Sequence, residues 1–223
     1  MEKKEYFREF FREMQLDRLM RYQVLNQYAI KGGILFTGSS LMEQFPINEL
    51  LMTNGMTEVI YNRGVAGFTT DDMLQHMDEM VFGIEPSRIF INIGTNDIAQ
   101  PDYRLEVLLE KYSRIILMIR ERLPKAEINM IAYYPVNETD KVLSDEERKE
   151  LFATRNNENI DTANAAVKQL AQKLGCRYID VSDGLRDRNG KLKSEYTIEG
   201  IHMYANGYQV VLDNLKKYLM PFV

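Results

Sequence analysis

Short apolar runs alternate with longer helical patterns along the chain. Apolar runs of about four to eight residues bounded by turn residues are typical of buried strands, whereas apolar positions three and four residues apart are typical of helices. The pattern predicts strands at 34–37, 58–61, 87–94, 127–134 and 177–181. It predicts helices over 5–29, from Ser40 onward, from near Thr69 onward, and over 103–123, 156–175 and 205–219.

Strands that alternate with helices predict an α/β protein with a parallel sheet and helices on both faces. Five strands in this order favour a three-layer, flavodoxin-like, doubly wound domain. No Gly/Ser/Pro-rich linker divides the chain. We therefore expect one domain over residues 1–223, with the helix over 5–29 as an N-terminal addition. Functional groups of such sheets gather beyond the carboxyl ends of the strands.

Four polar stretches follow predicted strands. They are Gly38-Ser39-Ser40-Leu41, NRGVAGFTT at 62–70, IGTNDIA at 93–99 and YTIEGIHMYANGY at 196–208. Each stretch alone is typical of an ordinary loop, because Gly and Asn are common turn residues. Together they contain a hydroxyl nucleophile, a base, a carboxylate and amide donors. These are the parts of an acyl-transfer site.

Histidine is the most informative residue type, because the chain has only two. His76 lies in a predicted helix, where we expect a structural role. His202 follows Glu199 by three residues in a predicted loop. That spacing lets the carboxylate approach the Nδ1–H of the imidazole and leaves Nε2 to accept a proton. The alternative is a histidine that merely caps the final helix.

Asn96 and Gly67 are the candidate donors of an oxyanion hole. Preorganised donors stabilise the charge of a tetrahedral intermediate, and loss of one typically slows the reaction about 10²–10³-fold. The Asn96 amide, the Gly67 N–H and the N–H of the nucleophile would supply three donors. Glycine at position 67 also lets the backbone approach a substrate without a Cβ in the way. The alternative is that Asn96 only braces its loop, with Asp97 as a turn partner.

The four stretches, in this order, resemble the blocks of the GDSL/SGNH hydrolase superfamily, and especially its bacterial branch similar to platelet-activating-factor acetylhydrolase-type esterases. The resemblance extends from Ile34 to the final helix. It implies the SGNH hydrolase fold and places the nucleophile at Ser40. Ser39 stands where the family usually has aspartate.

The resemblance also implies that His202 is the base and that Gly67 and Asn96 complete the oxyanion hole with Ser40. The family pattern is Asp-x-x-His, whereas this chain has Glu199 at the acidic position. Glutamate is one methylene longer, so it must fold back or approach from another angle. If it does not reach the imidazole, a backbone carbonyl would have to orient the ring. Losing the orienting acid slows a reaction by up to about 10⁴-fold.

The implied function is two-step hydrolysis of short-chain or acetyl esters, on a small molecule, glycan or lipid, with no metal or organic cofactor. One alternative is a carbohydrate acetylesterase, and another is a weakened relative that binds acylated ligands without turnover. A nucleotide-binding domain ranks last, because the first glycines of GGILFTGSS precede the strand rather than follow it. The segment 133–156 is long for a connection, which is typical of lids and binding segments.

Composition and charge narrow the class of protein further. The 223 residues are 45% hydrophobic, carry a net charge of −5 and show no basic stripe, so we expect neither nucleic-acid binding nor attraction to anionic membranes. No apolar stretch is long enough for a stable membrane span, and the charged N-terminus is unlike a secretory signal. A cytoplasmic protein is therefore expected. The single cysteine, Cys176, leaves no intrachain disulfide and shows no metal-ligand spacing.

The predicted N-terminal helix carries more apolar side chains than one core-facing stripe needs. They are Phe7, Phe10, Phe11, Met14, Leu16, Leu19, Met20, Val24 and Leu25. Either the helix packs under two elements of its own domain, or part of it meets a second subunit. Of the two, we favour a homodimer.

Overall fold

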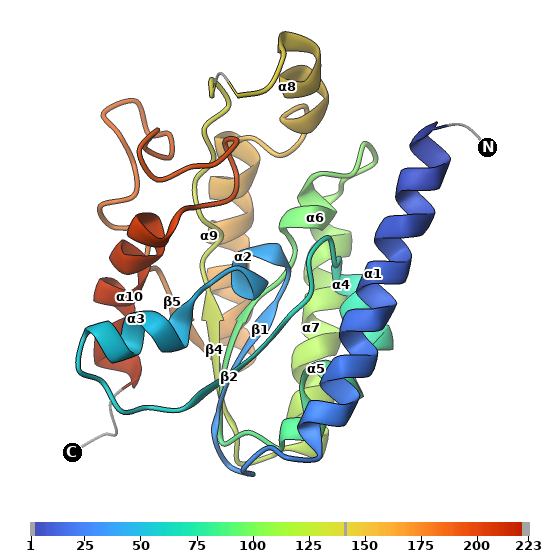
Figure 1. Ribbon diagram of the computed structural model, residues 1–223, viewed down its shortest axis with the longest axis vertical. Coiled ribbons are helices and arrows are strands. Elements are labelled where there is room, and N and C mark those ends of the chain that lie inside the picture. The colour runs from blue at the N-terminus through green and yellow to red at the C-terminus, as the bar shows by residue number, and fades with distance from the viewer. Residues whose placement is uncertain (1–2, 141, 220–223) are drawn as a thin grey trace.

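The computed structural model describes residues 3–140 and 142–219, and these residues form a five-stranded parallel sheet with helices on both sides (Figure 1). The strands are β1 (Ile34–Gly38), β2 (Ile60–Gly64), β3 (Arg88–Asn92), β4 (Glu127–Ile131) and β5 (Arg177–Ile179). Their order is β2-β1-β3-β4-β5, which is the flavodoxin-like order. The predicted α/β class and doubly wound sheet are confirmed. The ends of the predicted 1–223 domain, residues 1–2 and 220–223, lie outside the described residues.

The longer helices match the predicted ranges closely. The helices are α1 (Lys3–Asn26), α2 (Ser40–Glu43), α3 (Ile47–Thr53), α4 (Thr70–Gln75), α5 (Met77–Met80), the short 3₁₀ helix η1 (Phe82–Ile84), α6 (Thr95–Ile98), α7 (Leu105–Arg122), α8 (Asp145–Leu151), α9 (Asn157–Lys173) and α10 (Ala205–Leu219). Across residues 3–140 and 142–219, no helix combines the length and the apolar character that crossing a bilayer requires.

Alternate residues of the central strands point to opposite faces of the sheet, as the pleat requires. Leu35 and Ile89 belong to the core that includes side chains of α1, α7 and α9. Phe36 and Phe90 belong to the core on the other face, with α3 and α10, and their ring centroids lie 5.0 Å apart. The two cores hold the sheet between helix layers. Because the strands are all parallel, their carboxyl ends lie at the same edge of the sheet.

Strand β2 lies further along the chain than the predicted 58–61, because polar residues belong to it. Arg63 is buried in this strand, and its Nε donates to Asn26 Oδ1 at 2.8 Å. Its guanidinium also lies 4.9 Å from the ring centroid of Tyr22. Both partners come from α1. A search for apolar runs does not include an arginine in a strand. The contacts with Asn26 and Tyr22 show how its charge is accommodated.

Capping residues mark the starts of α4, which was predicted, and of α8, which was not. Thr69 caps α4 by accepting a hydrogen bond from the Asp72 N–H, which confirms the predicted start near Thr69. Ser144 and Glu147 form the same capping box at α8. Helix α8 lies inside the segment 133–156, which the sequence pattern left as a connection. It buries none of its residues, so it carries no apolar periodicity to detect.

Candidate active site

The carboxyl ends of β1, β2 and β3 bring three of the four sequence blocks to one edge of the sheet. Gly38, the last residue of β1, is in register with Gly64 of β2 and Asn92 of β3. Gly38 has φ +148°, and a Cβ there would lie 1.9 Å from the Asn92 carbonyl oxygen. Glycine is therefore required where β1 turns into α2. Ser40 begins α2 at this turn and is 9% exposed.

Ser40, His202 and Glu199 are linked by hydrogen bonds. His202 Nε2 lies 2.8 Å from Ser40 Oγ, and His202 Nδ1 lies 2.5 Å from Glu199 Oε1. The backbone N–H of His202 also donates to Glu199 Oε1, at 3.2 Å. The carboxylate, rather than a backbone carbonyl, therefore contacts the imidazole. With Nδ1–H donating to the carboxylate, Nε2 is the nitrogen that can accept the Ser40 proton.

A folded-back loop explains how the longer glutamate reaches the ring. Thr197 Oγ1 accepts from the Gly200 N–H at 2.7 Å and donates to the His202 carbonyl at 3.1 Å. The Gly200 carbonyl in turn accepts from the Asn137 N–H at 2.7 Å. Gly200 has φ +98°, a conformation that side-chain-bearing residues rarely adopt. These contacts turn the chain so that Glu199 faces His202.

Arg155 adds a positive charge near Glu199. Burial lowers the pKa of Arg155 to about 10, against the opposing influence of Glu199, so the guanidinium is still protonated at neutral pH. Burial by itself raises the pKa of the Glu199 carboxyl, but the hydrogen bonds and charge of His202, with the charge of Arg155, outweigh it. The net effect is a pKa below the usual value. Glu199 is therefore an anion at neutral pH and can stabilise an imidazolium at His202.

Both ends of the Asn96 amide are held. Its Nδ2 donates to the Phe68 carbonyl at 2.9 Å, and its Oδ1 accepts from Arg155 Nη2 at 2.9 Å. Arg155 Nε also donates to the Thr95 carbonyl, at 3.1 Å. An asparagine amide has two N–H donors, and Nδ2 makes only this one hydrogen bond within the part of the chain that the structure describes. One N–H is left for a ligand.

The Asp97 carboxylate bonds to the start of α4. Its carboxylate accepts from the N–H and the hydroxyl of Thr70, at 2.9 and 2.5 Å. Burial raises the pKa of Asp97, although these hydrogen bonds oppose the shift. Asp97 thus ties the loop after β3 to the start of α4, while Asn96 contacts Phe68 and Arg155.

The two peptides on either side of Ala66 are each held by a side chain from another segment. The Ala66 N–H donates to Glu43 Oε2 at 2.5 Å, and the Ala66 carbonyl accepts from Gln15 Nε2 at 2.7 Å. Because the carbonyl and the following N–H of a trans peptide point in opposite directions, Gln15 sets the direction of the Gly67 N–H. Gly67 has φ +77°, and a Cβ there would lie 2.5 Å from the Phe11 ring.

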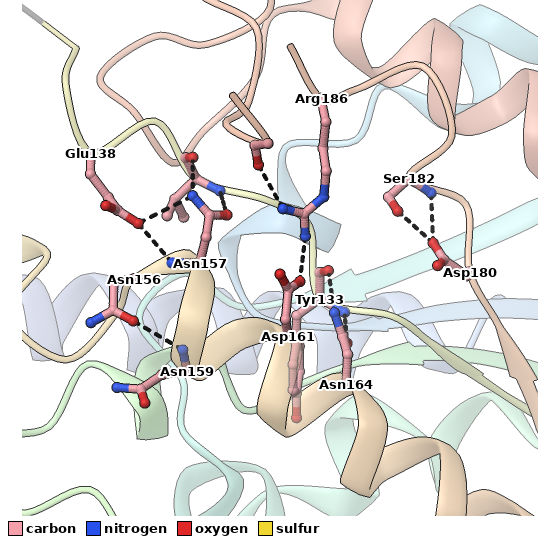
Figure 2. A network of polar contacts seen from close by, with 12 residues as sticks. Tyr133, Glu138, Asn156, Asn157, Asn159, Asp161, Asn164, Asp180, Ser182 and Arg186 are labelled. Carbon is pink, nitrogen blue, oxygen red and sulfur yellow. Dashed lines mark hydrogen bonds and ion pairs between the residues drawn. The ribbon is translucent and has the colours of Figure 1, made fainter. Parts of the chain in front are cut away.

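A polar network at the start of α9 anchors the segment that carries Arg155 (Figure 2). Glu138 accepts from the backbone N–H of Asn157 at 2.7 Å and from its Nδ2 at 3.1 Å. Further along α9, Asn164 bonds to both the N–H and the carbonyl of Tyr133, at 2.8 and 3.0 Å. The network fixes the beginning of α9 against the chain after β4. Arg155 lies two residues before α9, so this network also restricts the position from which it contacts Asn96.

Sequence reasoning missed Gln15 and Arg155. Gln15 is polar but only 8% exposed, on the face of α1 that packs inward. A polar residue at a core-facing helical position was the only signal for it. Arg155 lies in a stretch rich in polar residues, and nothing in that pattern distinguishes it from its neighbours.

The remaining sequence candidates have other surroundings. His76 ends α4, with its Nδ1 3.8 Å from a Glu79 carboxylate oxygen and its ring against Phe68. Cys176 is partly buried before β5, and burial raises the pKa of its thiol. Within the described residues, no group of three or more His, Cys, Asp and Glu side chains is arranged to hold a metal ion.

Comparison with known proteins identifies one family. Residues 47–210 match the GDSL-like Lipase/Acylhydrolase family. The matched range contains Gly67, Asn96, Glu199 and His202. It begins after Ser40 and after α1.

Solved structures of related proteins are similar to this chain over most of its length. The chain is 32% identical to a candidate platelet activating factor from Streptococcus pneumonia, with a TM-score of 0.85 over 97% of each chain. It shares its fold with an acetylxylan esterase from Geobacillus stearothermophilus, at 17% identity and a TM-score of 0.64, covering 87% of this chain and 96% of that one.

One curated relative is longer than this chain. An N-acylneuraminate cytidylyltransferase from Escherichia coli O18:K1:H7 (strain RS218 / NMEC) is 22% identical over 191 residues, which are 83% of this chain. The match spans only 40% of the length of that protein.

Proposed function

The chain belongs to the GDSL-like lipase/acylhydrolase family, and from this premise we propose that it is a serine ester hydrolase with Ser40 as its nucleophile. The observation that carries the proposal is the hydrogen-bonded series Glu199–His202–Ser40, with contacts of 2.5 and 2.8 Å. A nucleophile within hydrogen-bond reach of a base, which a third group orients, is the arrangement that activates a serine hydroxyl. The Glu199 contact also favours turnover over the alternative of a weakened relative that binds acylated ligands without turnover.

In the first step, His202 Nε2 takes the proton of Ser40 Oγ while that oxygen attacks the ester carbonyl carbon. The carbonyl oxygen becomes an oxyanion next to the Gly67 N–H, the Asn96 Nδ2–H and the Ser40 N–H. The bond to the alcohol then breaks, and the alcohol leaves with the proton from His202. Water, deprotonated by His202, attacks the acyl-enzyme, and release of the acid restores the Ser40 hydroxyl.

Gln15 and Arg155 act in this mechanism as positioning residues. Gln15 fixes the peptide that ends in the Gly67 N–H, and Arg155 fixes the amide of Asn96. Donors that are already aimed at the oxyanion need no reorganisation during the reaction, which is the main source of their effect. Neither residue belongs to the four sequence blocks.

The substrate class that we propose is a short-chain or acetyl ester. The segment 133–156, which brings Arg155 to the site, is rich in charged residues, and this composition argues against the apolar cap typical of a lipase for long acyl chains. A carbohydrate acetylesterase is the second candidate, favoured by the shared fold with the acetylxylan esterase. Initial rates on p-nitrophenyl esters of increasing chain length, compared with acetate release from acetylated xylan, separate the two.

Rates on p-nitrophenyl acetate test the proposed nucleophile. Ser40→Ala should lose activity by several orders of magnitude, because no oxygen remains to form the acyl-enzyme. Ser39→Ala is the matched control. The Ser39 side chain is buried, and its Oγ has no hydrogen-bond partner among the described residues. Activity retained in Ser40→Ala but lost in Ser39→Ala would contradict the assignment.

A further inference from the structure

The outward side of α1 carries many exposed apolar side chains, interspersed with charged ones. The helix lies at the outer edge of the molecule (Figure 1). Its inward face packs through Gln15, Leu19, Tyr22 and Asn26, all of them buried. On its other sides, nine large apolar side chains between Tyr6 and Leu25 are exposed. Large apolar side chains exposed in this number on one helix point to an interaction site.

One line of exposed side chains along α1 follows a seven-residue repeat. The repeat is formed by Phe10, Met14, Asp17, Arg21, Val24 and, in the turn after the helix, Tyr28. These positions alternate by four and three residues, which is the spacing of a helix that pairs with another helix along a seam. Asp17 and Arg21 are the charged members of this set, at its centre. Their side chains are 52% and 69% exposed and form an ion pair at 2.7 Å within the helix.

We propose that α1 pairs with α1 of a second copy of this chain, in antiparallel orientation about a two-fold axis midway between Asp17 and Arg21. In that register, Asp17 of each copy faces Arg21 of the other. Met14 then faces Val24, and Phe10 faces Tyr28. The apolar layers flank a central double ion pair, so the surface is complementary to itself, as a two-fold interface requires.

The charges of Asp17 and Arg21 favour an antiparallel over a parallel helix pair, and a second copy of α1 over a membrane surface. A parallel pair in the same register would place Asp17 against Asp17 and Arg21 against Arg21, and like charges opposite one another repel. A membrane surface is a poorer occupant, because both charges lie in the middle of the apolar face and would have to be buried with it. The net charge of −5 also opposes binding to anionic lipid. An inverted copy of the same helix matches both the apolar and the charged positions.

Sedimentation equilibrium of the full chain across the micromolar range tests the pairing, and it does not depend on whether Ser40 is catalytic. The parent should be a dimer that dissociates on dilution. Asp17→Arg and Arg21→Asp each place like charges in both central contacts, so each variant should dissociate at about tenfold or more higher concentration. Thermal unfolding followed by circular dichroism checks that both variants fold.

Sedimentation equilibrium of an equimolar mixture of the two variants is the most informative part of the experiment. Asp17→Arg presents two arginines and Arg21→Asp presents two aspartates, so the mixed pair has two attractive contacts and should recover dimers. The ion pair within each helix stays broken in the mixture, so loss of helix stability alone cannot give this recovery. A parent that is monomeric throughout, or variants that dimerise like the parent, would overturn the proposal. A monomeric parent that co-sediments with phosphatidylcholine vesicles would overturn it too and assign the face to a membrane.

Discussion

Arg155 Nη2 donates to Asn96 Oδ1 at 2.9 Å, and this contact joins the segment before α9 to helix α6, which follows β3. The two residues lie on different connections of the sheet and meet only in the folded chain. The contact turns the amide so that Nδ2 points to the other side, where one N–H is bonded to Phe68 and the second is left for a ligand. A partly buried guanidinium thus sets the direction of a proposed oxyanion donor.

Replacing Arg155 should lower kcat through Asn96. In Arg155→Ala the amide loses its acceptor-side contact, and we expect kcat for p-nitrophenyl acetate to fall by about tenfold to 10²-fold, with KM nearly unchanged. Arg155→Lys should not rescue it, because one ammonium cannot reproduce the fork that reaches both Thr95 and Asn96.

A double-mutant cycle separates this role from a general loss of structure. If Arg155 acts through Asn96, the Arg155→Ala/Asn96→Ala double variant should be little slower than Asn96→Ala alone. Multiplicative losses of kcat would show that the two residues act independently, against the account.

Gln15 should matter for turnover although it lies on the N-terminal helix. Gln15→Ala removes the donor to the Ala66 carbonyl at 2.7 Å and lets the Gly67 peptide rotate. We expect kcat to fall by about tenfold with KM little changed, since a displaced oxyanion donor weakens only the transition state. Gln23→Ala, at an exposed position of the same helix, is the matched control. Equal kcat in both variants would remove Gln15 from the mechanism.

Gly67 should tolerate no side chain. Gly67→Ala forces a Cβ into the left-handed region, which costs about 1–2 kcal/mol, and adds a clash 2.5 Å from the Phe11 ring. Gly32→Ala is a control with φ +80° and nothing within 4 Å of the new Cβ. It should therefore lose only the free energy that the left-handed backbone conformation costs. Urea unfolding should show a larger loss for Gly67→Ala, and Phe11→Ala should recover part of the difference. Equal losses in the two glycine variants would show that the Phe11 contact is unimportant.

The stabilisation that Glu199 gives should depend on pH with a defined sign. The pKa of Glu199 is lowered in the folded chain, chiefly because its contacts with His202 outweigh the opposing effect of burial. Its stabilising effect is therefore fully present above the ordinary glutamate pKa, about 4.3, and is lost as the pH falls through the lowered folded value. The free energy of unfolding of the parent, minus that of Glu199→Gln, should stay constant from neutral pH to about 4.3 and shrink as the pH falls further. A difference that grows on acidification would contradict the assigned direction.

The parts of the fold and site that are local in sequence could be predicted. Alternating apolar runs predicted the parallel sheet, and the polar stretches after its strands, together with the family resemblance, indicated Ser40, Gly67, Asn96 and His202 as candidates. The contact of Glu199 with His202 depended on how the loop 197–203 folds back, which spacing alone does not determine. The strand order confirms the expectation that these blocks meet at one edge.

The residues that sequence reasoning missed act across long chain separations. Gln15 reaches Ala66 over 51 residues, and Arg155 reaches Asn96 over 59. No periodicity or motif encodes such contacts, because each depends on the packing of a whole helix or segment. The buried Arg63 of β2 was missed for the same reason, since its partners Asn26 and Tyr22 come from α1.

The most direct test of the central claim is labelling of the parent with a fluorophosphonate probe, followed by mapping of the modified peptide. The probe reacts with a serine oxygen only when a base activates it. We expect modification at Ser40, lost in Ser40→Ala and in His202→Ala and retained in Ser39→Ala. A folded parent that takes up no probe, or takes it up at another serine, would contradict the account of Ser40 as an activated nucleophile.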